Sequence, residues 1–149
     1  MNTYTEEVGQ KLNELLEKTY DAEKGFKNAA ENIENTALKS YFKSKAQERY
    51  NFGHDLKDEI KSYNQEIDKG GSITGTAHRA WMDIKAMLSL DNEESMLEES
   101  IRGEKTAVKE YEEVLNEIHL PNSTKSLLET QKNKIEFGLE NIKTLEDIH

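Results

Sequence analysis

Apolar side chains recur every three or four residues along the first thirty residues of this chain, and this spacing is what most limits its fold. Between Val8 and Ile33 the apolar positions form one broad stripe, because an α-helix completes a turn every 3.6 residues. The same spacing returns in residues 38–67, 97–118 and 127–145. Each segment is long enough for a helix that must bury one face against others. The sequence therefore predicts four amphipathic helices around a shared core.

Capping and turn residues separate these stripes. Two capping boxes, Thr3–Glu6 and Asp91–Glu94, are expected to begin helices. The other boundaries are expected at Asn35-Thr36, at Gly70-Gly71 and at Pro121. Asparagine can close a helix in a left-handed conformation and threonine can cap the next one. We therefore expect Asn35 to end the first helix, Thr36 to cap the second, and Ser123 or its neighbour to open the last.

The connection between the second and third helices is long. About twenty residues separate Gly70 from Asp91, and residues 74–88 carry the pattern of a shorter helix of their own. An up-and-down bundle needs only a short turn there, whereas a long crossover is the ferritin-like arrangement. We therefore predict one domain over residues 1–149, an all-α, ferritin-like four-helix bundle with a short extra helix in the crossover. That helix could instead cap the end of the bundle, whereas an extended coiled-coil rod does not fit the turn signals.

Composition excludes several classes of function. The chain has 149 residues, of which 34% are charged, and its formal net charge is −10. This charge disfavours nucleic-acid partners and anionic membrane surfaces. The absence of cysteine rules out disulfides, thiolate catalysis and iron–sulfur clusters. The polar, acidic N-terminal residues do not resemble a signal peptide, and no apolar run is long enough to span a bilayer. A cytoplasmic protein is expected.

Three charged residues interrupt the apolar stripes. Glu23, Arg49 and Glu104 each fall on a stripe, about thirteen residues from a helix end that the crossover topology places at the same end of the bundle. At about 1.5 Å of rise per residue, all three would lie roughly 20 Å from that end. The sequence therefore predicts a buried charged layer of Glu23, Arg49 and Glu104.

Carboxylates at the middle of a bundle are typical of di-iron or di-manganese sites, which also require Glu-x-x-His motifs. Here Glu48 is followed three residues later by Asn51, and His54 lies about 140° around the helix from Arg49. A guanidinium can neutralise two carboxylates without metal. We therefore expect no cofactor. The alternative is iron or manganese held by a set of carboxylates and one histidine: Glu23, Glu48, Glu104, Glu136 and His54.

The expected crossover helix carries His78, Arg79 and Trp81, the only tryptophan. Trp81 either packs this helix onto the bundle or forms, with the other two, a patch for a small ligand or a partner. No catalytic constellation or nucleotide fingerprint is found. The first functional hypothesis is a structural or interaction protein, associated with stress, that binds a partner or a second copy, for example as a homodimer. The second is a carboxylate-bridged metal oxidase or iron handler.

Three segments also carry a family resemblance: LLEKTYDAEKGFKNAAENI (15–33), GGSITGTAHRAWMDIKAMLS (70–89) and IRGEKTAVKEYEEVL (101–115). Together they resemble an uncharacterised bacterial family of ferritin-like four-helix-bundle proteins, catalogued as a domain of unknown function. The resemblance extends over essentially the whole chain. It implies the ferritin-like fold with its crossover, but no activity and no functional residue.

Overall fold

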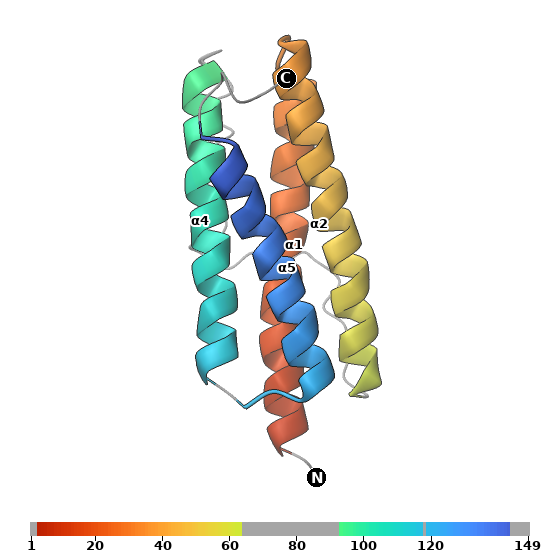
Figure 1. Cartoon of the computed structure of the whole chain (residues 1–149). Coiled ribbons are helices and arrows are strands. Elements are labelled where there is room, and N and C mark those ends of the chain that lie inside the picture. The colour runs from red at the N-terminus through yellow and green to blue at the C-terminus, as the bar shows by residue number, and fades with distance from the viewer. Residues whose placement is uncertain (1–2, 64–92, 118, 144–149) are drawn as a thin grey trace.

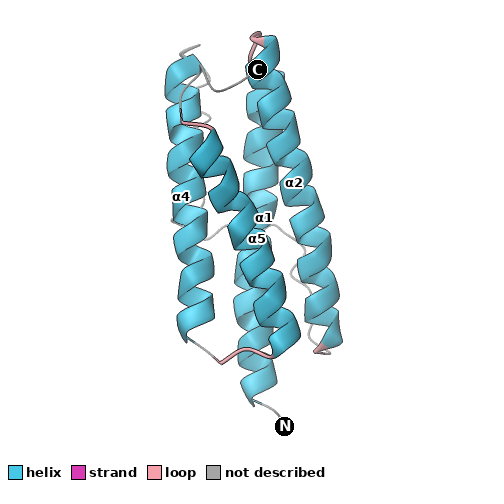
Figure 2. Ribbon diagram, viewed as in Figure 1, coloured by secondary structure: helices cyan, strands magenta, loops and turns pink. Residues whose placement is uncertain are grey.

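A computed structural model describes residues 3–63, 93–117 and 119–143 of the chain. These residues form four helices, α1 (Thr3–Glu31), α2 (Thr36–Ser62), α4 (Glu93–Glu117) and α5 (Asn122–Asn141). The described part contains no β-strand (Figure 2). For the described residues, the prediction of an all-α fold built on four long helices is therefore confirmed. The short helix expected over residues 74–88 lies outside the described residues.

Two polar contacts fix the direction of each helix. The Asn35 side-chain amide, in the turn between α1 and α2, donates to Glu93 Oε2 at 3.2 Å, so α4 begins beside that turn. At the other end, the Ser123 hydroxyl near the start of α5 donates to Glu59 near the end of α2, at 3.1 Å. Helices α2 and α4 therefore run in the same direction, while α1 and α5 run in the opposite one (Figure 1). The residues that flank the long connection lie at opposite ends of the bundle, as the predicted crossover requires.

The stripe predicted for α1 is buried along its whole length. Its members have at most 6% of their surface exposed, and they are Val8, Leu12, Leu15, Leu16, Thr19, Ala22, Phe26, Ala29, Ala30 and, just after the end of the helix, Ile33. A helix buries such a stripe because removing apolar surface from water is the main favourable contribution to folding. The predicted core of this helix is therefore confirmed.

Two of the predicted boundaries differ from those observed. The N-cap of α2 is Asn35 rather than Thr36, because the Asn35 Oδ1 accepts a hydrogen bond from the Leu38 amide at 2.9 Å. Asn35 has φ −59° and ψ 116°, which is the extended conformation typical of an N-cap and not the left-handed one. Helix α2 ends at Ser62 with Tyr63 as its C-cap, earlier than the end expected at Gly70-Gly71.

The core consists of two apolar clusters stacked along the bundle axis. One includes Leu12, Leu56 and Phe52, and the other includes Phe26 and Phe42. The two clusters meet at the middle of the bundle, where charged side chains lie. None of the described helices is long and apolar enough to cross a lipid bilayer.

Candidate functional site

A group of four charged side chains lies in the middle of the bundle. Lys45, Glu48 and Arg49 come from α2, and Glu104 comes from α4. The three α2 residues project from neighbouring positions, because residues three and four apart lie on one side of a helix. We call these four residues the charge cluster.

Each carboxylate of the charge cluster contacts both cations. Glu48 Oε1 lies 2.6 Å from Arg49 Nη1 and 3.9 Å from Lys45 Nζ. Glu104 pairs through Oε1 with Arg49 Nη2 and through Oε2 with Lys45 Nζ, the latter at 3.4 Å. Two positive and two negative groups thus form a closed ring with no net charge.

Burial makes this ring electrostatically strong. Arg49 is 3% exposed and Glu104 is 2% exposed. Burial by itself lowers the pKa of the Arg49 guanidinium, but the carboxylates of Glu104 and Glu48 outweigh that effect and the pKa lies above its ordinary value. The guanidinium also lies 5.6 Å and 5.5 Å from the ring centres of Phe26 and Phe52, which belong to the two different apolar clusters. Arg49 therefore joins the two halves of the core, and its charge is held at any ordinary pH.

A neutral polar network continues from the charge cluster toward α5. The Tyr111 hydroxyl of α4 donates to Gln131 Oε1 at 2.7 Å, and Gln131 Nε2 donates to the Phe52 carbonyl at 3.3 Å. Burial raises the pKa of Tyr111 well above its usual value. On the other side, burial raises the pKa of Tyr41 to about 12. Both phenols therefore stay neutral beside the ring of charges.

The structure brings together two of the three residues of the predicted charged layer. Arg49 and Glu104 form a direct pair. Glu23 is placed elsewhere: its side chain, 15% exposed, pairs with Lys27 of its own helix at 3.0 Å. Glu23 lies at the outer seam between α1 and α2, where its carboxylate can reach water, and not between α2 and α4.

Sequence reasoning missed Lys45, the second cation. A lysine is usually assigned to the surface, yet the signal was present in the spacing. Buried positions of α2 follow one another at three or four residues, namely Leu38, Phe42, Lys45, Arg49, Phe52, Leu56 and Ile60. Lys45 fills a place in this series that an apolar residue would otherwise occupy.

The residues of the alternative metal site are dispersed. His54 is exposed and its ring packs edge-on against Tyr50, with 4.7 Å between ring centres. Glu136 on α5 lies 3.8 Å from Lys132. Across residues 3–63, 93–117 and 119–143, no group of three or more histidine and carboxylate side chains is arranged to hold a metal ion. Glu48 and Glu104 do share one location, but Arg49 and Lys45 lie between them, so the residues there do not fit a metal.

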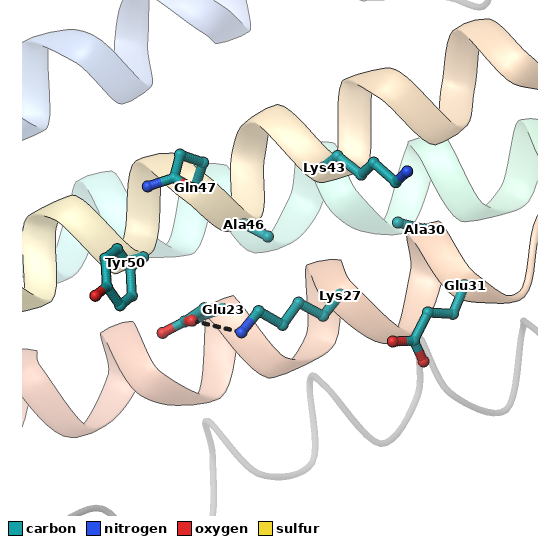
Figure 3. A pocket seen from close by; sticks show the side chains of 8 residues that line it. All are labelled: Glu23, Lys27, Ala30, Glu31, Lys43, Ala46, Gln47 and Tyr50. Carbon is teal, nitrogen blue, oxygen red and sulfur yellow. Dashed lines mark ion pairs between the residues drawn. The ribbon is translucent and has the colours of Figure 1, made fainter.

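A hollow of about 460 Å³ opens on the outer seam of α1 and α2, on the side of Glu23 (Figure 3). Ala30 and Ala46 are its apolar residues, while Lys43, Gln47 and Tyr50 project from α2 along its edge. The Glu23–Lys27 pair borders it on α1. The other predicted patch, His78, Arg79 and Trp81, lies outside the described residues.

In the part of the chain that the structure describes, these features define an all-α arrangement of four helices with a neutral charge cluster at its centre. The sequence profile of one family, described as "Domain of unknown function (DUF2383)", matches residues 7–117, and the chain belongs to that family. The match includes α1, α2 and α4 and stops before α5, so it is shorter than the resemblance noted from the sequence. No curated protein of known function matches the chain.

Proposed function

We propose that the protein is a ferritin-like bundle of the cytoplasm that has a structural or interaction role, associated with stress, and no enzymatic activity. The observation that carries this proposal is the charge cluster. In a carboxylate-bridged metal site, two metal cations are held by shared carboxylates at the middle of such a bundle. Here two side-chain cations, Arg49 and Lys45, are shared by two carboxylates in a comparable position.

The chemistry of the cluster supports a metal-free role. A metal ion prefers deprotonated oxygen or imidazole ligands and is repelled by fixed positive charges. Two fully charged carboxylates in one buried layer repel each other, and a cation is needed to keep both ionised. Arg49 provides that cation together with five N–H donors in a fixed plane. Each charge of the cluster therefore has an opposite charge of the same chain within ion-pair distance.

Elemental analysis tests the proposal. The protein is expressed in medium supplemented with iron and manganese, purified without chelator and measured by mass spectrometry of the elements. We expect far less than one metal ion per chain. The variant Glu104→Gln, which keeps the shape of the side chain, is expected to contain no less metal than the wild type, and Glu136→Gln serves as a matched control outside the cluster.

The alternative function is a carboxylate-bridged iron or manganese protein. Iron or manganese near one or two ions per chain, lost in Glu104→Gln and Glu23→Gln but kept in Glu136→Gln, would establish that alternative and refute the metal-free role. Thermal unfolding with and without EDTA gives an independent check. A metal-free bundle keeps its melting temperature, whereas a metal that binds only the folded chain raises it.

A further inference from the structure

We propose that the outer face of α2 binds the outer face of α5 from a second copy of the chain, so that copies associate head to tail. This inference rests on the proposed interaction role and names the partner. The two faces are defined by four residues each. The α2 face comprises Lys43, Ala46, Tyr50 and His54, and the α5 face comprises Glu129, Asn133, Phe137 and Glu140.

The α2 face carries Lys43 and borders the hollow of Figure 3, which residues of α1, including Glu23 and Glu31, also line. Lys43 and Tyr50 are both exposed, Tyr50 to 48%, and they border the hollow above Ala46. Within the described part of the chain Lys43 has no carboxylate within ion-pair distance, although acidic residues outnumber basic ones by 30 to 20. This face therefore offers a cation that is unpaired among the described residues, beside a hollow whose apolar residues are Ala30 and Ala46.

The α5 face carries two carboxylates and an exposed aromatic ring, with Lys134 beside Phe137. Phe137 is 68% exposed, which makes it the most exposed large hydrophobic residue of those described. Glu129 and Glu140 are exposed on the same side of α5, and neither has an ion-pair partner among the described residues. Burying the Phe137 ring against another chain would remove apolar surface from water, which favours association.

The spacing of the two faces agrees residue by residue. The α2 face follows intervals of three, four and four residues from Lys43 to His54, and the α5 face follows the same intervals from Glu140 back to Glu129. Because both are helices of equal rise, an antiparallel pairing aligns every position. Lys43 then meets Glu140 of the second copy, and Phe137 of the second copy enters the hollow at Ala46. Tyr50 meets Asn133 of that copy, and His54 meets its Glu129.

The partner is a second copy because each chain carries both halves of this match. The contact is heterologous, since the two faces are different surfaces, and such contacts produce rings or open chains rather than closed two-fold dimers. The net charge of −10 opposes close approach in general, but at physiological salt it is screened beyond about 8 Å. Short-range complementarity at the two faces then decides the association.

Sedimentation velocity of the full-length protein over a range of concentrations tests the proposal. We expect the wild type to grow beyond a dimer as its concentration rises. Lys43→Glu or Glu140→Lys is expected to weaken association about tenfold, and the double variant, with both changes in one chain, to restore it. Phe137→Ser is expected to weaken it more than either. Lys105→Glu, at an exposed site on α4, is the matched control and should leave association unchanged.

A mixing experiment separates this geometry from other modes of association. One variant has its α2 face blocked (Lys43→Glu with Gln47→Glu), and the other has its α5 face blocked (Phe137→Ser with Glu140→Lys). Each alone should remain monomeric, while an equimolar mixture should give a complex of one copy of each and nothing larger. Circular dichroism verifies that both variants are folded.

A wild type that is monomeric at every concentration overturns the proposal. A dimer that forms no larger species, or an association that the charge reversals leave unchanged, also overturns it. These results do not depend on the metal content. A metal-loaded protein that still associates as described would refute only the proposed metal-free role, and a metal-free monomer would refute only the head-to-tail contact.

Discussion

Gly138 on α5 leaves the space in which the ammonium group of Lys45 on α2 lies. A Cβ atom built at residue 138 would stand 2.6 Å from Lys45 Nζ, closer than two such atoms approach in proteins. The absence of a side chain at Gly138 therefore lets Lys45 reach Glu104 from the α5 side. The glycine is a part of the charge cluster although it carries no charge.

Gly138→Ala tests this relationship. Replacing a glycine by alanine inside a helix normally stabilises it by about 1 kcal/mol. At residue 138 we expect no such gain in a chain that keeps Lys45, because the new methyl group displaces the Lys45 ammonium. The gain should return when Lys45 is replaced by methionine, and urea denaturation of the four variants in a double-mutant cycle measures the coupling.

Gly53→Ala is the matched control for this cycle. A Cβ at residue 53 would meet Leu16, Thr19 and Tyr20 at 3.8–3.9 Å, which is ordinary van der Waals contact. We expect this substitution to stabilise the protein, with no dependence on Lys45. Equal effects at the two glycines would contradict the role assigned to Gly138.

Arg49→Ala should be strongly destabilising. The substitution leaves Glu48 and Glu104 with Lys45 as their one shared cation in the charge cluster, and breaking a buried pair from one side costs about 3–5 kcal/mol. The free energy of unfolding from urea titration measures the loss. Arg102→Ala removes an exposed arginine that pairs with Glu99, and an exposed pair is worth about 0–1 kcal/mol. Similar losses in both variants would show that burial does not matter here.

Glu59 of α2 supports the start of α5. The N-cap of α5 is Pro121, which makes no side-chain capping bond. The Glu59 carboxylate instead accepts hydrogen bonds from the hydroxyls of Ser123 and Thr124, close to the positive end of the helix dipole. Glu59→Ala should cost about 1–2 kcal/mol and speed hydrogen exchange of the first amides of α5. Asp58→Ala, at the exposed neighbouring position, should do neither.

Tyr111 gives the stability a dependence on alkaline pH. Burial raises the pKa of Tyr111 in the folded chain, while an unfolded tyrosine titrates near pH 10. Above about pH 10 the unfolded state releases the phenol proton and the folded state keeps it, so stability falls as the pH rises, by about 1.4 kcal/mol per pH unit. Below that pH the group contributes no pH dependence.

The variant Tyr111→Phe isolates this effect. The difference in unfolding free energy between wild type and variant should be constant at neutral pH and should shrink as the pH rises above about 10. A difference that stays constant up to about pH 11.5 would contradict the assignment. Absorbance at alkaline pH, which follows ionised phenols, should likewise show one fewer late-titrating tyrosine in the variant.

Apolar periodicity was sufficient to predict the four described helices, and the complete stripe of α1 shows that it also predicted a buried face. It placed Arg49 and Glu104 in the core, because both occupy stripe positions and their helices run as the crossover topology requires. It could not place Glu23, since a stripe about 100° wide includes the seam as well as the centre. The burial of Lys45 could be predicted from its place in the α2 series, but its contact with Gly138 joins helices that are far apart in sequence, and no local pattern reports such a contact.

The distance in sequence between the partners of the charge cluster has a consequence for the order of folding. Arg49 and Glu104 are separated by 55 residues, whereas α1 with α2, and α4 with α5, pack as neighbours in the chain. Contacts near in sequence form before those that must close a long loop. We therefore expect the three charged residues of α2 to stay hydrated until α4 packs against them late in folding. An interaction that forms after the transition state slows unfolding and leaves the rate of folding almost unchanged. The charge cluster would therefore contribute mainly to the kinetic stability of the folded bundle.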